Sequence, residues 1–194
     1  TTIWLMRRLG KSGTALPGLL MEKISKKPLE SLGKLPEGAI FVTGTNGKTT
    51  TTKMMVDILK DSGFKVVTNR SGSNFTRGLL ASTAESASWS GRVSGDIAVL
   101  EVDEAYGPAL AAIIKPRAVL ALNVFRDQLD RYGEIDKTAA CIAESAKYAQ
   151  MSVINSNDRA LVAEFKKHNV KNITTFSIGS KLKDQLPNEE QLHG

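Results

Sequence analysis

The chain has 194 residues, 41% hydrophobic and 24% charged, with a net charge of +6, which is the composition of a globular domain with one substantial core. No apolar run approaches the roughly 20 residues of a membrane-spanning helix and no secretory signal is visible, so we expect a cytoplasmic protein. The single cysteine, Cys141, excludes an internal disulfide and a zinc site built from several cysteines.

The first 38 residues are rich in glycine and proline, and they predict short helices and turns laid over a sheet rather than a separate domain. Six apolar or β-branched runs follow, and most are continuous, as expected of strands buried on both faces. These runs are Ala39–Thr43, Phe64–Thr68, Ile97–Val102, Ala118–Val124, Ser152–Asn155 and Ile173–Ser177. The tail, residues 181–194, is polar and predicts no closing element.

Helical spacing of apolar residues predicts helices in four intervals between these runs, at residues 48–62, 74–86, 136–149 and 157–167. The first of these places Met55, Ile58 and Leu59 on one stripe and ends at Gly63. Strands that alternate with helices predict an α/β fold with a mostly parallel sheet covered by helices on both faces.

The stretch VTGTNGKTTTT, Val42 to Thr52, joins the first strand to the first helix. The N–H groups of such a turn and of a helix N-terminus point at a bound anion, and Gly44 and Gly47 let the backbone approach closely. Lys48 can reach terminal phosphates, and Thr49 can place its hydroxyl on a magnesium ion. The standard nucleotide loop has four residues between its glycines, and here the first glycine position is a valine. The alternative is a plain strand-to-helix turn.

A magnesium ion between phosphates usually needs a carboxylate ligand as well. Glu101 is the first acid at the end of the run IAVLE, and Asp103 and Glu104 lie just beyond it. Acids at strand ends are often only solvated, which is the alternative here. Together with the lysine loop, Glu101 is the better candidate for a magnesium ligand.

Two further loops carry polar side chains and follow other predicted strands. In a parallel sheet such loops gather at the carboxyl ends of the strands, where open α/β folds bind ligands. The alternative for the second loop is an ion-paired first turn of a helix. The first loop contributes Asn69, Arg70, Ser71, Gly72, Asn74 and Arg77, and the second contributes Arg126, Asp127, Gln128, Asp130 and Arg131.

Five motifs, in the order GTALPGLL, TGTNGKTTTT, NRSGSNFTRGLLAS, VLEVDEA and NVFRDQLDRYGE, resemble the Mur ligase superfamily. Within it they resemble the MurT-type subunits of lipid II isoglutaminyl synthase, with FRDQLDRYGE as the most discriminating piece. The resemblance implies an N-terminal segment at 1–38, an incomplete Mur ligase central, ATP-binding domain at 39–180, and a tail at 181–194. It further implies that the tail leads to a zinc ribbon and a C-terminal domain, so we expect the N-terminal part of a longer protein.

The resemblance implies that the protein is an ATP- and magnesium-dependent ligase of peptidoglycan synthesis. Such proteins activate the α-carboxylate of D-glutamate in the lipid II stem peptide as an acyl phosphate. Ammonia from a GatD-type glutaminase partner then reacts with the acyl phosphate to give D-isoglutamine. The protein is expected to contact the membrane surface only through its lipid substrate. By motif match, Thr49 and Glu101 would hold magnesium and Asn74 would lie near the transferred phosphate. The nucleotide would be held by Gly44, Thr45, Asn46, Gly47, Lys48, Thr49 and Thr50.

The chain departs from ordinary Mur ligases at two positions. They carry a histidine after the aspartate of the fourth loop, where this chain has Gln128, and a carboxylated lysine on the next helix, where it has Cys141 or Ile142. These side chains are poor magnesium ligands, so the resemblance implies no second metal site of the usual Mur kind. Zinc is expected in the full-length family member, but no zinc site is expected in this chain. His168 and His193 look exposed, and neither is expected to be catalytic.

Three other functions stay open at this point. Another Mur or folylpolyglutamate-type ATP-dependent amide ligase would need the histidine that Gln128 replaces. A nucleic-acid-dependent P-loop ATPase would need a longer glycine loop and a clustered basic stripe, whereas the lysines and arginines of this chain are scattered and we expect no nucleic acid partner. A nucleotide-binding regulatory module without catalysis is the third.

Overall fold

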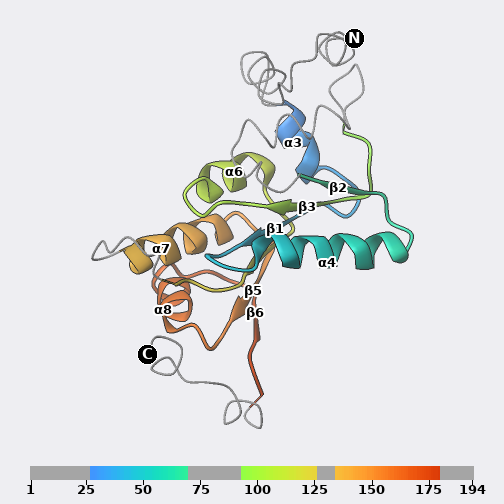
Figure 1. Ribbon diagram of the computed structural model, residues 1–194. Coiled ribbons are helices and arrows are strands. Elements are labelled where there is room, and N and C mark those ends of the chain that lie inside the picture. Colours follow the sequence, from blue (N-terminus) through green and yellow to red (C-terminus); the bar gives the residue numbers. More distant parts are fainter. Residues whose placement is uncertain (1–26, 70–92, 126–133, 180–194) are drawn as a thin grey trace, which may run out of the picture.

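The computed structural model describes residues 27–69, 93–125 and 134–179 (Figure 1). Within these ranges six strands form one sheet in the order β2-β3-β1-β4-β5-β6, and every neighbouring pair is parallel. The strands are β1 Ala39–Thr43, β2 Val66–Thr68, β3 Ile97–Glu101, β4 Ala118–Ala121, β5 Met151–Asn155 and β6 Ile173–Phe176. The described helices are α3 Lys27–Gly33, α4 Lys48–Asp61, α6 Gly107–Ile114, α7 Glu134–Ala146 and α8 Arg159–Lys167. The predicted α/β class with a parallel sheet is confirmed.

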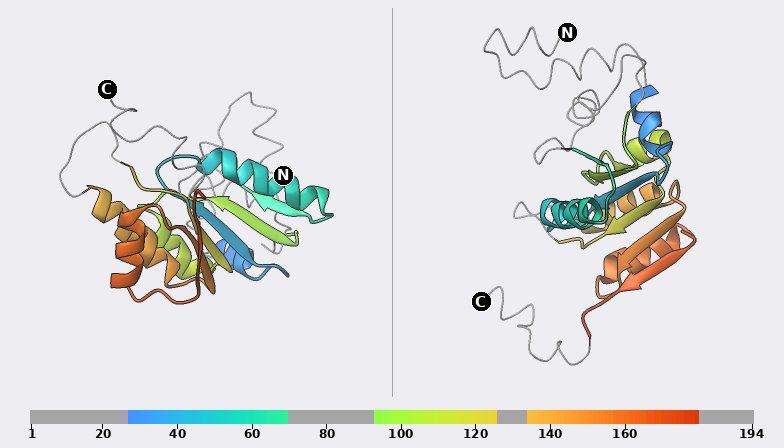
Figure 2. Two further views of the ribbon diagram at one scale, coloured as in Figure 1. Left: turned by 90° about the horizontal axis from the view of Figure 1, so that it is seen from below. Right: turned by 90° about the vertical axis from the view of Figure 1, so that its right-hand side faces the viewer.

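Helices cover both faces of the sheet, as predicted (Figure 2). Helix α4 packs on one face, where a small apolar cluster joins Val56 to Val42 of β1 and Val99 of β3. The opposite face carries α3, α6, α7 and α8 over a larger cluster that includes Phe41 and Leu100. Successive side chains of a strand point to opposite faces, so each central strand contributes apolar residues to both clusters. The central strands therefore appear in the sequence as continuous apolar runs. Among the described helices, none is long and apolar enough to span a bilayer.

All six predicted strands are present, but β3 and β6 end one residue before their apolar runs, and β2 and β4 are shorter than theirs by two or more residues. Strand β2 begins at Val66 because the N–H of Phe64 still donates to Leu59 O and closes the end of α4. Strand β4 ends at Ala121 because the residues after it turn toward the loop that follows β1. The predicted helix at 74–86 lies outside the described residues, and the domain boundaries at residues 38 and 180 stay predictions.

Helix α6 is an element that the pattern did not predict. Its sequence GPALAAII is apolar almost throughout, so it has no polar face to mark a helical period. Leu110, Ala111 and Ile114 are buried in the larger core cluster. Packing of this segment against the sheet and α7, and not a periodic sequence pattern, therefore accounts for its helical conformation.

Two predictions about burial are wrong in part. Strand β6 is exposed along its whole length, because β5 is its only neighbour among the described strands and it forms that edge of the sheet. On α4, Ile58 points to solvent, whereas Thr52 and Val56 are the buried residues, with Met55 and Leu59 partly buried beside them. Residues 52 and 56 lie one turn apart, so the buried stripe is real but lies further round the helix than predicted.

His168, at the end of α8, is not exposed as predicted. Its Nδ1 lies 3.3 Å from a carboxylate oxygen of Glu144 on α7, and its Nε2 lies 3.3 Å from a carboxylate oxygen of Glu164 on its own helix. Lys147 and Lys167 pair with the same two carboxylates. These five charged or titratable groups link the outer ends of α7 and α8.

Helices α6 and α7 approach closely at Gly107. A Cβ added there would lie 2.5 Å from Oγ of Ser145, whose hydroxyl donates to Cys141 O at 2.8 Å. We predict that Gly107→Ala lowers the free energy of unfolding by about 1–3 kcal/mol, the usual cost of overpacking. The double variant Gly107→Ala with Ser145→Ala should recover most of this loss, because the clashing oxygen is gone. Urea unfolding of both variants measures it, and equal losses in the two would contradict this account.

The ion pairs of α7 give a pH-dependent stability. A hydrogen bond from Lys147 holds the pKa of Glu144 below its ordinary value of 4.5, partial burial opposes this shift, and His168 adds to it. A lowered carboxyl pKa stabilises the folded state above the unfolded-state value and loses this effect as the pH falls through the folded-state value. We therefore predict that Glu144→Gln costs up to about 1 kcal/mol above pH 4.5 and progressively less below it.

Unfolding by urea at a series of pH values measures this difference. Lys147→Met removes the main cause of the shift and should show the same pH dependence. A penalty for Glu144→Gln that stays constant from neutral pH down to acid pH would refute the assignment.

Candidate functional site

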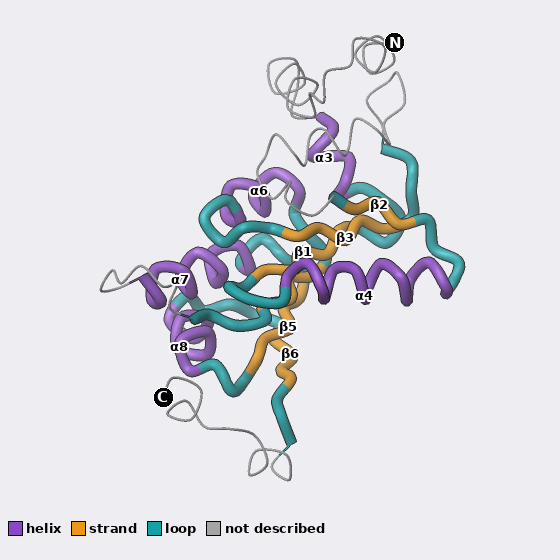
Figure 3. Tube along the Cα trace, viewed as in Figure 1, coloured by secondary structure: helices purple, strands orange, loops and turns teal. Residues whose placement is uncertain are grey.

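The loop after β1 lies at the topological switch point of the sheet. Strands β2 and β3 lie on one side of β1, and the later strands β4, β5 and β6 lie on its other side. Strand β1 pairs with β3 on one side and β4 on the other, α4 follows β1 on one face, and α6 follows β3 on the opposite face. Ligands of open α/β sheets usually bind beside the carboxyl ends of two strands whose following helices lie on opposite faces, as those after β1 and β3 do. Figure 3 shows the loops that leave the two strands at this edge.

The glycines of the loop are required for two different reasons. Gly44 has φ +131° and Gly47 has φ +85°, a region that residues with a Cβ rarely adopt. At Gly44 a Cβ would also lie 2.8 Å from Asn123 O, so the neighbouring segment leaves no space for it. Gly47 precedes α4, and its carbonyl accepts the first helical hydrogen bond, from Thr51 N at 2.9 Å. A glycine at this position offers no side-chain acceptor to the first-turn amides, which point out of the helix N-terminus.

Asn123, just after β4, holds the middle of the loop. Its Oδ1 accepts from Asn46 N at 2.9 Å, and its Nδ2 donates to Asn46 O at 3.0 Å. Its main-chain oxygen accepts from Thr45 N at 2.9 Å. Phe125 N donates to the hydroxyl of Thr45 at 3.0 Å, two residues further on. The loop is thus fixed by the strand next to β1 and not by its own sequence alone.

Asp158 holds that neighbouring segment in turn. One of its carboxylate oxygens accepts from Val124 N at 2.6 Å, and the other accepts from Leu161 N at 3.1 Å as the N-cap of α8. Neither Asn123 nor Asp158 was among the predicted site residues. The N-cap rule could have identified the capping role of Asp158, but no signal in the sequence pairs Asn123 with Asn46.

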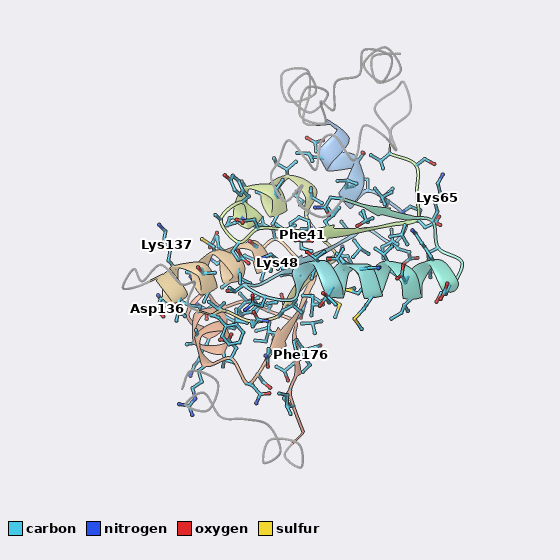
Figure 4. The ribbon with its side chains drawn as sticks, in the orientation of Figure 1. Phe41, Lys48, Lys65, Asp136, Lys137 and Phe176 are labelled. Carbon is cyan, nitrogen blue, oxygen red and sulfur yellow. The ribbon has the colours of Figure 1, made fainter. Side chains whose placement is uncertain are left out.

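Lys48 lies at the beginning of α4 and folds back over the loop (Figure 4). Its Nζ donates to Gly44 O at 2.5 Å and to Oε1 of Glu104 at 2.9 Å. The same carboxylate oxygen accepts from Gly44 N at 3.1 Å. An anionic oxygen therefore lies at the start of the loop, bound by a backbone amide and an ammonium group, as a phosphate oxygen would be.

Glu101, the predicted magnesium ligand, is the last residue of β3 and is buried. It pairs with Val42 in the sheet, one position before the end of β1. Because side chains alternate along a strand, Glu101 shares the face of Val99, which is the face that α4 covers. Asn69 fixes this strand end, since its Oδ1 accepts from Glu101 N at 2.9 Å and its Nδ2 donates to Glu101 O at 2.8 Å.

The remaining predicted residues divide between described and undescribed parts of the chain. Thr49 and Thr50 are exposed on the first turn of α4. Asn74 and the polar residues of both further loops, apart from Asn69, lie outside the described residues. Within the described ranges, no group of three or more histidine, cysteine, aspartate or glutamate side chains could hold a metal ion.

Cys141 and Ile142, the two positions that match the carboxylated lysine of ordinary Mur ligases, lie on α7 and differ in their surroundings. Ile142 is fully buried in the core. Cys141 is half-buried, and burial raises the pKa of its thiol above the ordinary value of 9.0 while Lys137 acts in the opposite direction. A buried alkyl chain and a thiol are both poor ligands for magnesium, and the absence of a second metal site stays a prediction.

The hydrogen bonds of Asn123 lead to a prediction about the loop. We expect Asn123→Ala to lower the free energy of unfolding by about 1–3 kcal/mol, because Asn46 loses both partners of its peptide groups. Hydrogen exchange at the amides of Thr45 and Asn46 should accelerate more than elsewhere. Asn157→Ala is the matched control, since Asn157 accepts a single bond from Ile178 N outside the loop. Unchanged exchange at both loop amides would show that Asn123 does not hold them.

Comparison with known proteins agrees with this geometry. Residues 42–193 match the Mur ligase middle domain family. The chain is 32% identical over 160 residues to the lipid II isoglutaminyl synthase (glutamine-hydrolyzing) subunit MurT of Staphylococcus aureus strain N315, covering 82% of this chain and 36% of that protein. It is 40% identical over 156 residues to the MurT subunit of Streptococcus pneumoniae strain ATCC BAA-255 / R6, covering 79% of this chain and 34% of that protein.

Solved structures give the same fold. The MurF ligase of Thermotoga maritima in complex with ADP superposes with a TM-score of 0.67 at 24% identity, over 80% of this chain and 36% of that one. A bifunctional folylpolyglutamate synthase/dihydrofolate synthase with Mn, AMPPNP and L-glutamate bound gives a TM-score of 0.59 at 17% identity, over 78% and 46%. The chain spans about a third of the length of the curated relatives it matches. The resemblance predicted from the motifs is confirmed, and the chain belongs to the Mur ligase middle-domain family.

Proposed function

We propose that this chain is the nucleotide-binding part of an ATP-dependent amide ligase that converts the D-glutamate of the lipid II stem peptide to D-isoglutamine. In this reaction the γ-phosphoryl group of ATP passes to an α-carboxylate oxygen, which gives an acyl phosphate and ADP. Ammonia attacks the acyl carbon, phosphate leaves, and a proton is lost to solvent. The observation that carries the nucleotide part is the anion position formed by Gly44 N and Lys48 Nζ.

The loop fits a phosphate chain. One of its amides, Gly44 N, and the ammonium group of Lys48 already bind one anionic oxygen, that of Glu104, so their charge and direction suit an oxyanion. Gly44 and Gly47, which have positive φ values, carry no side chain that could obstruct the approach of a ligand. The nucleotide phosphates would be held by Gly44, Thr45, Asn46, Gly47, Lys48, Thr49 and Thr50.

Thr49 and Glu101 would hold magnesium. A hydroxyl and a carboxylate are oxygen donors of the kind that Mg²⁺ prefers, and this ion usually takes only one or two protein ligands beside water and phosphate oxygens. When bound, magnesium would neutralise charge on the phosphates. No zinc donor set is found in the described residues, and a zinc ribbon in the rest of the protein stays an expectation from the family.

The chain's own residues mainly position reactants and neutralise charge. Lys48 would stabilise negative charge that moves toward the bridging oxygen of the leaving ADP, and the loop amides would hold the phosphates in one orientation. Asn123 would keep the loop in its conformation by accepting from the amides of Thr45 and Asn46, and Asp158 would hold the segment of Asn123 by accepting from Val124 N. Asn74 would lie near the transferred phosphoryl group by motif match.

The acceptor and the ammonia source rest on the relatives. Two relatives that match about four-fifths of the chain are MurT subunits of a glutamine-hydrolyzing lipid II isoglutaminyl synthase. This supports a glutaminase partner of the GatD type and lipid II as the acceptor. UDP-N-acetylmuramoylalanine–D-glutamate ligases are also similar, at 30% identity over 154 residues in one case, so an amino-acid ligase is the second candidate.

The two candidates separate in one assay. The full-length protein with its glutaminase partner, ATP, glutamine and lipid II should yield a product in which one hydroxyl is replaced by an amino group, as mass spectrometry detects. ADP formation that requires a free amino acid instead of glutamine would favour the second candidate. ADP formation stimulated only by DNA or RNA would contradict both.

The ammonium group of Lys48 gives a prediction at the nucleotide itself. Lys48→Ala in the full-length protein should weaken binding of magnesium-ATP by about tenfold or more, because a charge-assisted bond to phosphate is lost. Lys60→Ala is the matched control, since Lys60 is exposed in the last turn of the same helix. Isothermal titration calorimetry measures both, and equal affinities in the two variants would remove Lys48 from the site.

A further inference from the structure

Glu104 occupies the position that the nucleotide site offers to an anion. Its Oε1 accepts from both Gly44 N at 3.1 Å and Lys48 Nζ at 2.9 Å. The side chains of Glu104 and Lys48 are each only 15% exposed, so the ion pair is largely shielded from solvent. Water screens such a pair less than a surface pair.

The turn that carries Glu104 does not depend on the Glu104 side chain for its shape. Asp103 holds this turn, because its Oδ1 accepts from Ala105 N at 3.0 Å and its main-chain oxygen accepts from Tyr106 N and Gly107 N. The hydrogen bonds of the Glu104 carboxylate among the described residues go to Gly44 N of the loop after β1 and to Lys48 Nζ at the start of α4. The side chain can therefore leave the loop by rotation about its own bonds while the backbone stays in place.

A phosphate chain and this carboxylate compete for the same donors. Gly44 N has one hydrogen to donate, and the carboxylate oxygen that receives it would be in contact with an incoming phosphate oxygen. Two anions at such a distance repel strongly in a partly buried site. Nucleotide binding at this loop therefore requires the Glu104 carboxylate to move.

We propose that Glu104 is an internal competitor that sets nucleotide affinity and makes it depend on a divalent cation. The proposal rests on the nucleotide-binding function given above. A nucleotide complexed with a cation brings less negative charge to the carboxylate, and the cation offers the displaced carboxylate an alternative partner. A nucleotide without a cation must displace Glu104 against the full repulsion, so it binds weakly.

The test is calorimetric titration of ADP into the full-length protein, once with magnesium and once with a chelator. Glu104→Gln keeps the size of the side chain and removes its charge. If Glu104 holds the loop nine-tenths of the time, this variant should bind ADP without the cation about tenfold more tightly than wild type. The ratio between the affinities with and without magnesium should shrink correspondingly.

Asp103→Asn is the matched control, because it removes one negative charge from the neighbouring residue and keeps an oxygen for Ala105 N. It should behave as wild type if the contact matters rather than the general charge of the site. Glu104→Ala serves as a second variant and should show the same gain, with thermal unfolding confirming that each variant is folded.

The outcomes separate this inference from the function on which it rests. If wild type binds magnesium-ADP and neither Glu104 variant gains affinity under chelation, the competitor role is wrong and the nucleotide site stands. A loss of affinity in the Glu104 variants with magnesium, without any gain under chelation, would also overturn it, since Glu104 would then act only as a cation ligand and not as a competitor. Absence of ADP binding in every variant would overturn the nucleotide-binding function and this inference with it.

Discussion

The parallel pairing of β1 between β3 and β4 is the constraint on which the rest of the site depends. It places the segments that follow three different strands at one edge of the sheet, although they are far apart in the chain. The loop after β1 then lies between Glu104 on one side and Asn123 on the other. Helices α4 and α6, which follow β1 and β3, cover opposite faces of the sheet.

The pairing of β1 with β4 also holds the loop after β1 in its conformation. Positive φ values at Gly44 and Gly47 limit the choice of residue, but they do not fix the conformation by themselves. Hydrogen bonds from the segment after β4 to Thr45 and Asn46 do so, and Asp158 ties that segment to the start of α8. Strand pairing, helix capping and loop shape are thus parts of one connected network.

Electrostatics gives this network its chemical character. The chain carries a net charge of +6, yet the scattered surface cations say little about a ligand. What matters is that one partly buried ammonium group, that of Lys48, and one backbone amide, that of Gly44, are directed at the same oxygen atom. An arrangement of this kind binds an anion of any source, and Glu104 shows that the chain supplies one of its own.

The sequence alone determined the class of fold, the six strands and the place of the glycine loop between β1 and α4. Each of these depends on local signals, namely continuous apolar runs, glycine at a strand-to-helix turn, and a lysine directly after it. Tertiary structure decided the rest. Helix α6 has no polar face to reveal it, β6 reads as apolar yet lies at an exposed sheet edge, and the partners of Lys48 and Asn46 come from residues 56 and 77 positions away. Such contacts follow from which strands are neighbours, and a pattern of adjacent residues carries no information about that order.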